Sequence, residues 1–551
     1  MFCAVCATAA GLTGCGGGGR GSSTPPTPAP QFPDSLVRVS AASPFGPNCD
    51  GTGQTAGLNL NAEVEPSLAA NPRDPGNLIG VWQQDRWSTG SARGIVAGVS
   101  LDGGVSWQQQ AMPFSRCAGG TPANGGDYAR VSDPWVTIAP DGIAYQNALA
   151  STGGTFQPGS ANALLVSRST DSGRTWSNPV ALITDSQAFF NDKNSITADP
   201  TDARFVYATW DRLPQTGDSG PAYFARSADR GVTWETARPI YDAGPSGQTI
   251  NNQIVVLPEG TLVDFFTQFD TAPNRSVTSS INVVRSLDKG STWSQRIKIA
   301  DVTSVGTRDP EAGTRVREGT NLCSIAVSPQ GVLNAVWQDA RATDGVRDNI
   351  LLSRSTDGGL TWSVPARINA DPTVPAFTPT VAARADGTIG VTYYDFRSNT
   401  ADVQTLLTDY WLIRSTDGVT WRESRVAGPF DLAIAPNANG LFLGDYQALI
   451  SIGNVFVPFF AQSSNGDLAN RTDVYAVVAR NASAGAAAAV PAAKRAGDAA
   501  NAVGEYRAEV APATPVAQQF KRAVHENIVQ MMEQRVQGWS RRGTPEAPAP
   551  N

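Results

Sequence analysis

The chain has 551 residues, of which 41% are hydrophobic and only 17% are charged, and its formal net charge is −7. This balance gives no reason to expect a nucleic-acid partner, and no basic stripe crosses the sequence. The 54 glycines and 38 prolines stand between short apolar runs, a composition typical of many strands joined by turns.

The first segment in chain order has features of an exported leader. Residues 1–15 end in Leu12-Thr-Gly-Cys15, which resembles the bacterial lipobox, whose cysteine carries the lipid. Residues 16–33 are rich in Gly, Ser, Thr and Pro and are predicted to form a flexible tether. We therefore expect lipidation at Cys15 and a protein that is lipid-anchored at the bacterial cell envelope, with the membrane as a partner, or secreted. The alternative is an N-terminus that is merely rich in small residues.

Residues 34–480 contain one pattern, Ser-x-Asp-x-Gly-x-Thr/Ser-Trp, six times. Its Asp and Ser side chains can bond backbone N–H groups across a tight turn, and its glycine supplies a positive φ. Successive tryptophans lie 58 to 69 residues apart, about the length of a four-stranded sheet, so the pattern indicates an array of equivalent units. The copies are Ser100–Trp107, Ser169–Trp176, Ser227–Trp234, Ser286–Trp293, Ser355–Trp362 and the shorter Ser415–Trp421.

This pattern resembles the Asp-box of the sialidase (BNR/Asp-box repeat) superfamily, which includes bacterial exo-α-sialidases. The resemblance covers roughly residues 36–480 and implies an all-β propeller of four-stranded blades. Seven pairs of apolar strands accompany the six boxes, so we expect seven blades, with six as the alternative. The stretch Leu36–Ser40 would then pair with the last blade and close the ring, which removes an exposed sheet edge.

Export to an oxidising compartment changes how the cysteines are interpreted. Cys49 and Cys117 both lie in loops of the first repeat and are the predicted disulfide. Cys323 begins a buried-looking strand and is predicted to be a small core residue.

The geometry of a propeller assigns polar residues to one mouth. The boxes join third strands to fourth strands, so they lie on the face away from the mouth at which first strands begin and second strands end. Two groups of residues share that mouth. The ends of second strands carry Asp85-Arg86, Asp211-Arg212, Asp339 with Arg341 and Asp395 with Arg397, and the starts of first strands carry Glu63, Glu65, Asp133, Asp192-Lys193, Asn251-Asn252, Arg317-Glu318 and Asp445-Tyr446.

The resemblance to sialidases implies roles for some of these groups. Those enzymes use a tyrosine nucleophile, assisted by a glutamate, together with an aspartate as acid/base. The candidates are Tyr446 as nucleophile, Asp133 as acid/base and Glu65 as the assisting group, with Tyr394, Asp192 and Glu318 as second choices.

The same resemblance implies a receptor for the substrate carboxylate, because the arginine fork binds carboxylates bidentately. The candidate receptor consists of Arg212, Arg341 and Arg397, and Arg86 and Asp192 complete the substrate-binding set. In the alternative interpretation, the recurring Asp–Arg pairs tie adjacent loops together and Tyr446 caps the last blade.

Several chemistries lack the residues they need. The single histidine, His525, lies near the C-terminus, which excludes a Ser-His-Asp triad and a histidine-based zinc site in the propeller. No glycine-rich loop is followed by Lys-Ser/Thr, so no phosphate cradle is present. We expect no cofactor and no metal site.

Beyond Arg480 the repeats stop. Residues 481–515 are rich in Ala and Pro and are predicted to be a linker, whereas the apolar spacing of residues 516–541 predicts an amphipathic helix. That helix can dock on the propeller, pair with itself or lie on a membrane. We favour docking.

Taken together, these patterns predict an exo-acting glycoside hydrolase on acidic, sialic-acid-type glycans or glycoproteins. The absence of an Arg-Ile-Pro motif favours the alternative, a non-catalytic propeller that binds a glycan or protein partner at the cell envelope. A third hypothesis is an envelope scaffold whose C-terminal helix makes the functional contact.

Overall fold

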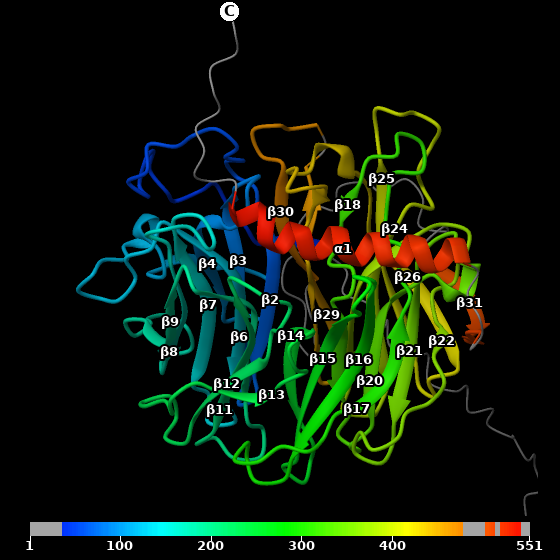
Figure 1. Cartoon of the computed structure of the whole chain (residues 1–551), viewed down its shortest axis with the longest axis horizontal. Coiled ribbons are helices and arrows are strands. Elements are labelled where there is room, and N and C mark those ends of the chain that lie inside the picture. Colours follow the sequence, from blue (N-terminus) through cyan, green and yellow to red (C-terminus); the bar gives the residue numbers. More distant parts are fainter. Residues whose placement is uncertain (1–35, 465, 478–501, 513–517, 541–551) are drawn as a thin grey trace, which may run out of the picture. The chain divides into compact units, whose positions relative to one another are not determined.

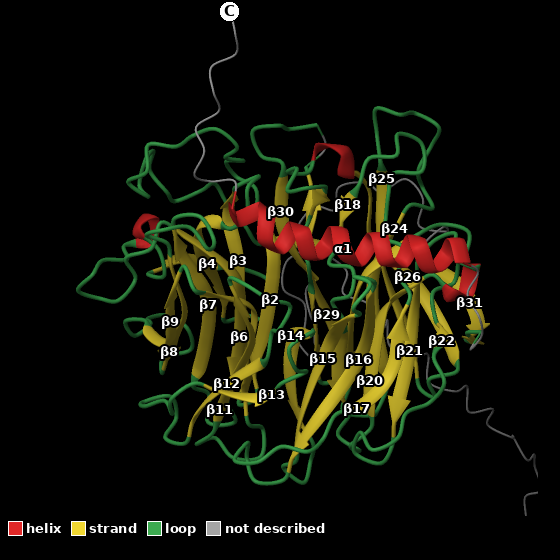
Figure 2. Cartoon of the chain, in the orientation of Figure 1, coloured by secondary structure: helices red, strands yellow, loops and turns green. Residues whose placement is uncertain are grey.

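The computed structural model describes residues 36–464, 466–477, 502–512 and 518–540. Strands dominate this part of the chain (Figures 1 and 2), which folds as an all-β propeller with one α-helix, α1 (Gln518–Ser540). The predicted leader 1–15 and tether 16–33 lie outside the described residues, so lipidation at Cys15 stays a prediction. A search of the described residues finds no helix with the length and apolar character needed to cross a membrane.

The largest sheet has eight strands and contains two repeat units. The units join only where Ala92 pairs with Val131. The first unit contains β2 (Val64–Asn71), β3 (Asp74–Arg86), β4 (Ala92–Ser100) and β5 (Gln108–Met112), and the second contains β6 (Arg130–Ile138), β7 (Ala144–Thr152), β8 (Ala161–Ser169) and β9 (Val180–Ser186).

Five further sheets have four or five strands each, the size of a single blade. The first contains β10 (Phe189–Ala198), β11 (Val206–Pro214), β12 (Ala222–Ser227) and β13 (Arg238–Tyr241). The second contains β14 (Gly247–Val256), β15 (Leu262–Thr271), β16 (Val277–Ser286) and β17 (Ile297–Val302). The third is β19 (Ser324–Val327), β20 (Leu333–Asp339), β21 (Asn349–Ser355), β22 (Ala366–Arg367) with β32 (Glu509–Val510).

The fourth is β23 (Ala376–Ala383), β24 (Ile389–Asp395), β25 (Leu407–Ser415), β26 (Thr420–Asp431) with β31 (Ala502–Arg507). The fifth is β28 (Ala448–Ile452), β29 (Val455–Ser463), β30 (Thr472–Val477) with β1 (Leu36–Arg38). A separate parallel pair joins β18 (Val316–Arg317) to β27 (Leu441–Phe442).

This division corrects the predicted blade count. The sequence predicted seven separate four-stranded blades, with six as the alternative, whereas the structure has five single-blade sheets and one double sheet. The cause is local, because the ends of β4 and β6 come close enough for Ala92 and Val131 to pair.

The first described strand closes the ring as predicted. β1 pairs antiparallel with β30 through Leu36 and Val477, Val37 and Ala476, and Arg38 and Tyr475. The Ser40 hydroxyl extends the contact by donating to Asp473 over 2.8 Å. The start of the propeller thus covers the edge of its last sheet.

The repeated pattern forms the turn that its residues predict. In all six copies the serine hydroxyl donates to the aspartate. In the first copy, the amide of Gly104 also donates to Ser100, and the Trp107 indole donates to the carbonyl of Gly104 over 3.0 Å. These bonds satisfy backbone groups at each turn without placing a reactive group in a pocket.

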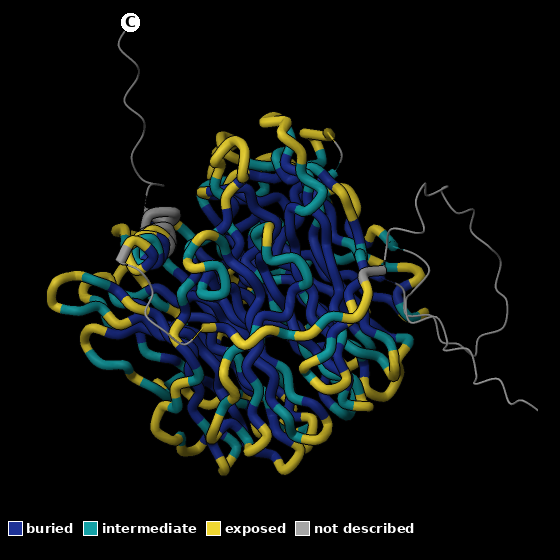
Figure 3. Tube along the Cα trace, turned by 90° about the vertical axis from the view of Figure 1, so that its right-hand side faces the viewer, coloured by how far each residue is buried: buried dark blue, intermediate teal, exposed yellow. Residues whose placement is uncertain are grey.

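Large apolar side chains fill the space between adjacent sheets. Trp82, Trp210 and Trp337 occupy the second strands of three units and are fully buried. Figure 3 shows the same division along the chain, with buried strands and exposed loops. The predicted disulfide between Cys49 and Cys117 is present, and Cys323 is a free, buried thiol in the core.

The innermost strands of five units begin with the same irregularity. Each contains a β-bulge, and the first residue of the bulge has a φ between 48° and 63°. Such angles are uncommon outside glycine, and a bulge re-aims the side chain it carries. Because the five strands are equivalent, the bulges bring their side chains to one end of the propeller. These residues are Glu65, Asp133, Lys193, Asn251 and Thr378.

The C-terminal segment returns to the propeller. β31 and β32 add fifth strands to two sheets, inside the stretch 481–515 that was predicted to be only a linker. Helix α1 then buries Phe520, Val524 and Ile528 against Phe269 and other apolar residues of the propeller. The helix therefore docks on the propeller, the favoured one of its three predicted arrangements.

Candidate active-site cleft

A polar cleft lies at the end of the propeller where the bulges gather. It encloses about 720 Å³ of space, open solvent included. Its charged lining residues come from units that are distant in the sequence. They are Arg86, Asp133, Asp192, Lys193, Arg315, Arg317, Glu318 and Asp445.

Lys193 is the hub of an ion network in this cleft. Its ammonium nitrogen lies 2.7 Å from Asp445 Oδ2, 3.1 Å from Asp133 Oδ2 and 3.7 Å from Glu65 Oε1. The Lys193 side chain is 8% exposed and the three carboxylates are buried further. A buried ammonium with three carboxyl groups around it holds the bulges of three units in a fixed relation.

Arginines complete the network around Asp445. Arg317 donates to both oxygens of this carboxylate, over 3.1 and 2.7 Å. Arg317 and Arg86 also lie over the ring of Phe442, at 4.6 and 4.7 Å from its centroid. Phe442 therefore spaces two like charges while it contributes a cation–π contact to each.

This environment separates the proton affinities of the acidic groups. Burial opposes ionisation of Asp445, but Arg317 and Lys193 outweigh it and hold the pKa of that carboxyl well below its ordinary value. Burial raises the pKa of Glu65 to about 8, although Lys193 opposes the shift. Burial also raises the pKa of Glu318. At neutral pH, Asp445 is thus a carboxylate, whereas Glu65 is largely protonated.

The pKa of the base Arg86 shifts downward, opposite to the shifts of Glu65 and Glu318. Burial, helped by the nearby charge of Arg317, lowers the pKa of Arg86 to about 10. Its Nη1 donates to Gln83 over 2.6 Å, while its buried Nε has no hydrogen-bond partner in the part of the chain that the structure describes.

Arg315 and Glu318 form the opposite wall of the cleft. Glu318 accepts hydrogen bonds from the Thr307 amide, over 3.1 Å, and from the Thr320 hydroxyl. Within the described residues, the half-buried guanidinium of Arg315 makes no hydrogen bond or ion pair. Arg315 and Arg86 thus bring unused N–H donors to the cleft, the property that an anion receptor needs.

Some predicted site residues meet in this cleft. Asp133, Asp192 and Arg86 line it, and Glu65 lies directly behind Lys193. Glu65 also accepts hydrogen bonds from the Gln83 side chain and from the Asp445 amide, over 3.3 Å. These predicted residues therefore lie at one mouth of the propeller, and their roles stay predictions.

The predicted arginine receptor does not form. Arg212 binds both oxygens of Asp185 and lies 3.6 Å from the centroid of Phe189, in a groove away from the cleft. Arg341 binds both oxygens of Asp339 at 2.8 Å, so its charge is neutralised within its own unit.

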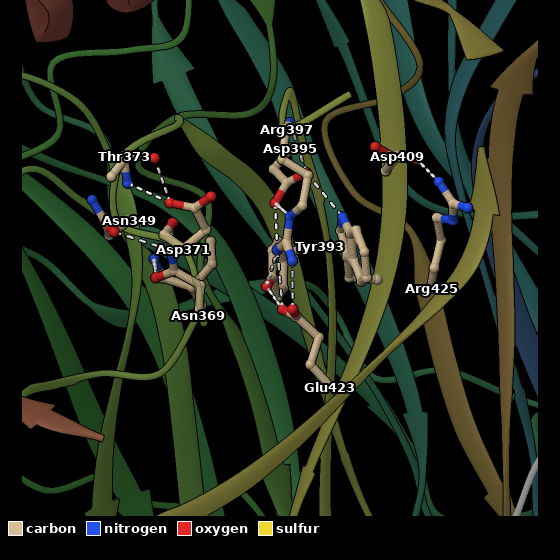
Figure 4. A network of polar contacts seen from close by, with 12 residues as sticks. Asn349, Asn369, Asp371, Thr373, Tyr393, Asp395, Arg397, Asp409, Glu423 and Arg425 are labelled. Carbon is tan, nitrogen blue, oxygen red and sulfur yellow. Dashed lines mark hydrogen bonds and ion pairs between the residues drawn. The ribbon is translucent and has the colours of Figure 1, made fainter. Parts of the chain in front are cut away.

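The guanidinium of Arg397 also pairs with carboxylates of its own unit (Figure 4). It lies between Asp395 and Glu423, with a 2.6 Å contact to each, and 3.7 Å from the ring centroid of Trp411. The three arginines of the predicted receptor thus each pair with local carboxylates, as the alternative interpretation held. The reason is that each unit supplies its own carboxylate at hydrogen-bond distance.

The tyrosine candidates also have structural partners. The Tyr446 hydroxyl donates to the carbonyl of Pro134 over 3.3 Å, and its ring packs on Trp135 and lines a second pocket, which shares Asp445 and Leu322 with the cleft. Burial and the surrounding carboxylates raise the pKa of Tyr446 well above its ordinary value, which disfavours a phenolate nucleophile. Tyr394 is fully buried and donates to the carbonyl of Ala461.

Sequence reasoning underrated three residues of the cleft: Lys193, Arg315 and Asp445. Lys193 and Asp445 were named only as neighbours of other candidates, and Arg315 was not named. A signal for the bulges was present, since Glu65, Asp133 and Thr378 each precede a proline at the start of an apolar strand. Among the described residues, no group of three or more His, Cys, Asp or Glu side chains is arranged to hold a metal ion.

Comparisons with known proteins return matches of low identity. No family model matches the chain. A xyloglucanase of Paenibacillus sp. is 26% identical over 297 residues, which cover 49% of this chain and 26% of the enzyme. The chain thus spans about a quarter of the length of that curated relative.

Solved structures with a similar backbone include two kinds of glycan-degrading enzyme. A Hadza microbial sialidase is 18% identical, with a TM-score of 0.36, and the match covers 76% of this chain and 66% of that one. An α-L-arabinofuranosidase of Fusarium graminearum is 13% identical, with a TM-score of 0.41, and covers 66% and 93%. The propeller fold itself rests on the sheets described above.

Proposed function

We propose that this protein is a glycoside hydrolase whose active site is the cleft around Asp133, Lys193 and Glu318. The observation that carries the proposal is that two carboxyl groups line one cleft: Glu318, whose pKa is raised by burial, and Asp133, held beside the ammonium of Lys193. Hydrolysis of a glycosidic bond needs such a pair, one group as proton donor and the other as an anion. The similarity to a xyloglucanase of Paenibacillus sp. supports the same reaction class.

The role of Glu318 follows from its raised pKa, and the role of Asp133 follows from its position. Glu318, whose pKa is raised by burial, is the proposed general acid for the leaving group. Asp133, held 3.1 Å from Lys193, is the proposed base or nucleophile on the other side. Lys193 and Asp445 orient Asp133, and Tyr446 supports the floor of the cleft through its bond to the Pro134 carbonyl.

We further propose that the substrate carries an anionic group. Arg315 and Arg86 line the cleft, and a carboxylate on the sugar would fit their guanidinium groups bidentately. The charge of Glu318 acts on Arg315, and those of Glu65 and Asp445 act on Arg86. This assigns the acidic-glycan specificity to Arg86 and Arg315 in place of Arg212, Arg341 and Arg397.

A panel of fluorogenic glycosides tests the activity. Full-length protein would be assayed with acidic and neutral aryl glycosides, alongside the variants Asp133→Asn and Asp242→Asn, the second being an exposed aspartate outside the cleft. We expect turnover of an acidic substrate that falls about 100-fold or more in Asp133→Asn and is unchanged in Asp242→Asn. Turnover of no glycoside in the panel, or equal turnover by both variants, would sink the proposal.

The second candidate function is glycan binding without catalysis. The observation that favours it is that Lys193 brings Asp445, Asp133 and Glu65 into one ion network, which stabilises the cleft without any substrate. The same panel separates the two functions. Saturable binding of an acidic sugar by calorimetry, with no turnover of its aryl glycoside, would establish the binding function.

We propose an extracytoplasmic location, and the Cys49–Cys117 disulfide supports it, because disulfides persist in oxidising compartments. Lipid anchoring through Cys15 is part of this proposal. Labelling cells with a radioactive fatty acid would test it, since Cys15→Ser protein should take up no label if Cys15 is the anchor.

A further inference from the structure

The wall of the cleft that carries Arg315 and Glu318 is a long loop. Residues 303–322, here called the cleft loop, run from the end of β17 to the start of β19. The loop includes the short strand β18, and it supplies Arg315, Arg317 and Glu318 to the cleft. The position of this loop therefore sets the position of every charged group on that wall.

Its first residues are fixed by carboxylates of the neighbouring unit. Asp348 accepts hydrogen bonds from the Ser304 hydroxyl and from the amides of Val305 and Gly306, over 3.0 and 3.1 Å. Asp339 accepts from the Thr303 amide over 3.0 Å. These bonds hold one end of the loop and leave its cleft-facing part to other contacts.

Helix α1 supplies contacts at both ends of the loop. Its Asn527 side chain donates to the carbonyl of Ser304 over 3.3 Å. Its buried residues Phe520, Val524 and Ile528 share one apolar cluster with Leu322 and Ile250. Leu322 and Ile250 themselves line the cleft, so one layer of side chains separates the helix from the site.

Two glycines leave room for these helix contacts. A Cβ on Gly345 would lie 2.3 Å from the ring of Phe520, and a Cβ on Gly306 would lie 2.6 Å from the amide oxygen of Asn527. The docking position is also fixed by the backbone, since the Val277 amide donates to His525 Nδ1 over 3.1 Å. The propeller surface is thus shaped to take the apolar face of the helix.

We propose that α1 is a positioning element for the cleft, and that Phe520 and Asn527 are its positioning residues. By packing on Leu322 and binding Ser304, the helix holds the cleft loop so that Arg315, Arg317 and Glu318 face the site. Within residues 518–530, the apolar side chains of Phe520, Val524 and Ile528 are buried in this contact, so this part of the helix acts on the site in its own chain. The consequence for turnover rests on the proposed function, whereas the coupling between helix and loop does not.

Hydrogen exchange measured by mass spectrometry tests the coupling in the full-length protein. The variants are Phe520→Ala and Asn527→Ala, and the control is Lys521→Ala, an exposed residue on the same helix. We expect amide exchange in residues 303–322 to rise about tenfold in Phe520→Ala and by a smaller factor in Asn527→Ala, because local opening of the loop becomes easier. Residues 64–86, far from the helix in the sequence, should exchange as in the wild type, and so should the whole Lys521→Ala protein.

Unchanged exchange of residues 303–322 in both variants would overturn the proposal. If Phe520→Ala lowers the thermal midpoint so far that all segments exchange faster, Asn527→Ala decides, since it removes one hydrogen bond and no apolar contact. For an active enzyme, we expect kcat/KM for an acidic glycoside to fall about fivefold in Asn527→Ala, with a lower kcat and a higher KM, because the loop carries both the proposed acid Glu318 and Arg315. If the wild type turns over no glycoside, the proposed function fails and the exchange result still decides the role of the helix.

Discussion

The ammonium of Lys193 lies 2.7 Å from a carboxylate oxygen of Asp445, although 252 residues separate the two in the chain. Lys193 stands on the bulge within β10, and Asp445 lies three residues before β28, the innermost strand of the last sheet. The pair therefore links the middle of the propeller to its end across the cleft. Backbone strain at the bulge of Lys193, with a φ of 48°, is retained because the ion contacts fix the side chain there.

Removal of the hub charge should destabilise the propeller. In Lys193→Met, the carboxylates of Asp133 and Asp445 lose their shared partner while buried, and we expect the free energy of unfolding to fall by about 3–5 kcal/mol. Urea unfolding followed by tryptophan fluorescence measures the change. The matched control is Lys298→Met, which removes an exposed pair with Asp301 and should cost about 0–1 kcal/mol. Equal costs in the two variants would contradict the role assigned to Lys193.

The raised pKa of Glu65 makes stability depend on pH. In the folded protein its pKa is about 8, against an ordinary value of 4.5. Between these values the folded state holds a proton that the unfolded state has lost, so the free energy of unfolding falls as pH rises from about 5 to about 8. Glu65→Gln removes this dependence, because the amide cannot ionise.

The measurement compares unfolding free energies of Glu65→Gln and wild type at several pH values. We expect the variant to gain stability relative to the wild type steadily from pH 5 to pH 8. A difference that stays constant over this range would show that Glu65 is ionised in the folded protein, contrary to the effect of its burial.

Arginine substitutions distinguish the cleft from the side networks. Arg315→Gln removes a guanidinium without a described partner, so we expect the unfolding free energy to change by less than about 0.5 kcal/mol. Affinity for an acidic sugar, measured by calorimetry, should fall about tenfold, the loss expected for one charge-assisted contact. Neutral sugars should be unaffected.

Arg397→Gln should have the reverse effects of Arg315→Gln on stability and on sugar affinity. It leaves Asp395 and Glu423 buried without their partner, and we expect a loss of about 3 kcal/mol in stability with unchanged sugar affinity. If Arg397→Gln abolished binding of the acidic sugar in a folded protein, the receptor predicted from sequence would be restored.

The fold was largely predictable from local chemistry. Each repeated turn is specified by its own Ser, Asp and Gly, whose hydrogen bonds join residues close in the sequence. Six copies of the pattern therefore predict six repeat units from the sequence alone. The sequence also predicted that Leu36–Arg38 closes the ring, because the last unit carries no repeated turn and so lacks an outer strand. The strands at 502–510 were missed although Tyr506, Ala508 and Val510 alternate with charged residues, because the segment is short and lies in an Ala- and Pro-rich stretch. Their pairing depends on the open edges of β22 and β26.

The candidate site was predictable only as a region. The positions before the innermost strands were correctly placed at one mouth, since strand direction fixes that. Which arginines converge depends on distances across the ring, and no local pattern encodes them. Arg212 and Arg397 were misassigned because their partners, Asp185 and Glu423, lie 27 and 26 residues away and were not seen as partners.

The most direct test of the cleft as a hydrolytic site uses Glu318 and the leaving group of the substrate. We would compare kcat/KM of the wild type, Glu318→Gln and the control Glu311→Gln on an acidic glycoside with a nitrophenyl group and on one with an alkyl group. Protonation matters for the alkyl leaving group and little for nitrophenolate. The account predicts that Glu318→Gln loses about 100-fold or more on the alkyl glycoside and far less on the nitrophenyl glycoside, while Glu311→Gln loses nothing on either. Equal losses on both substrates, or none, would contradict it.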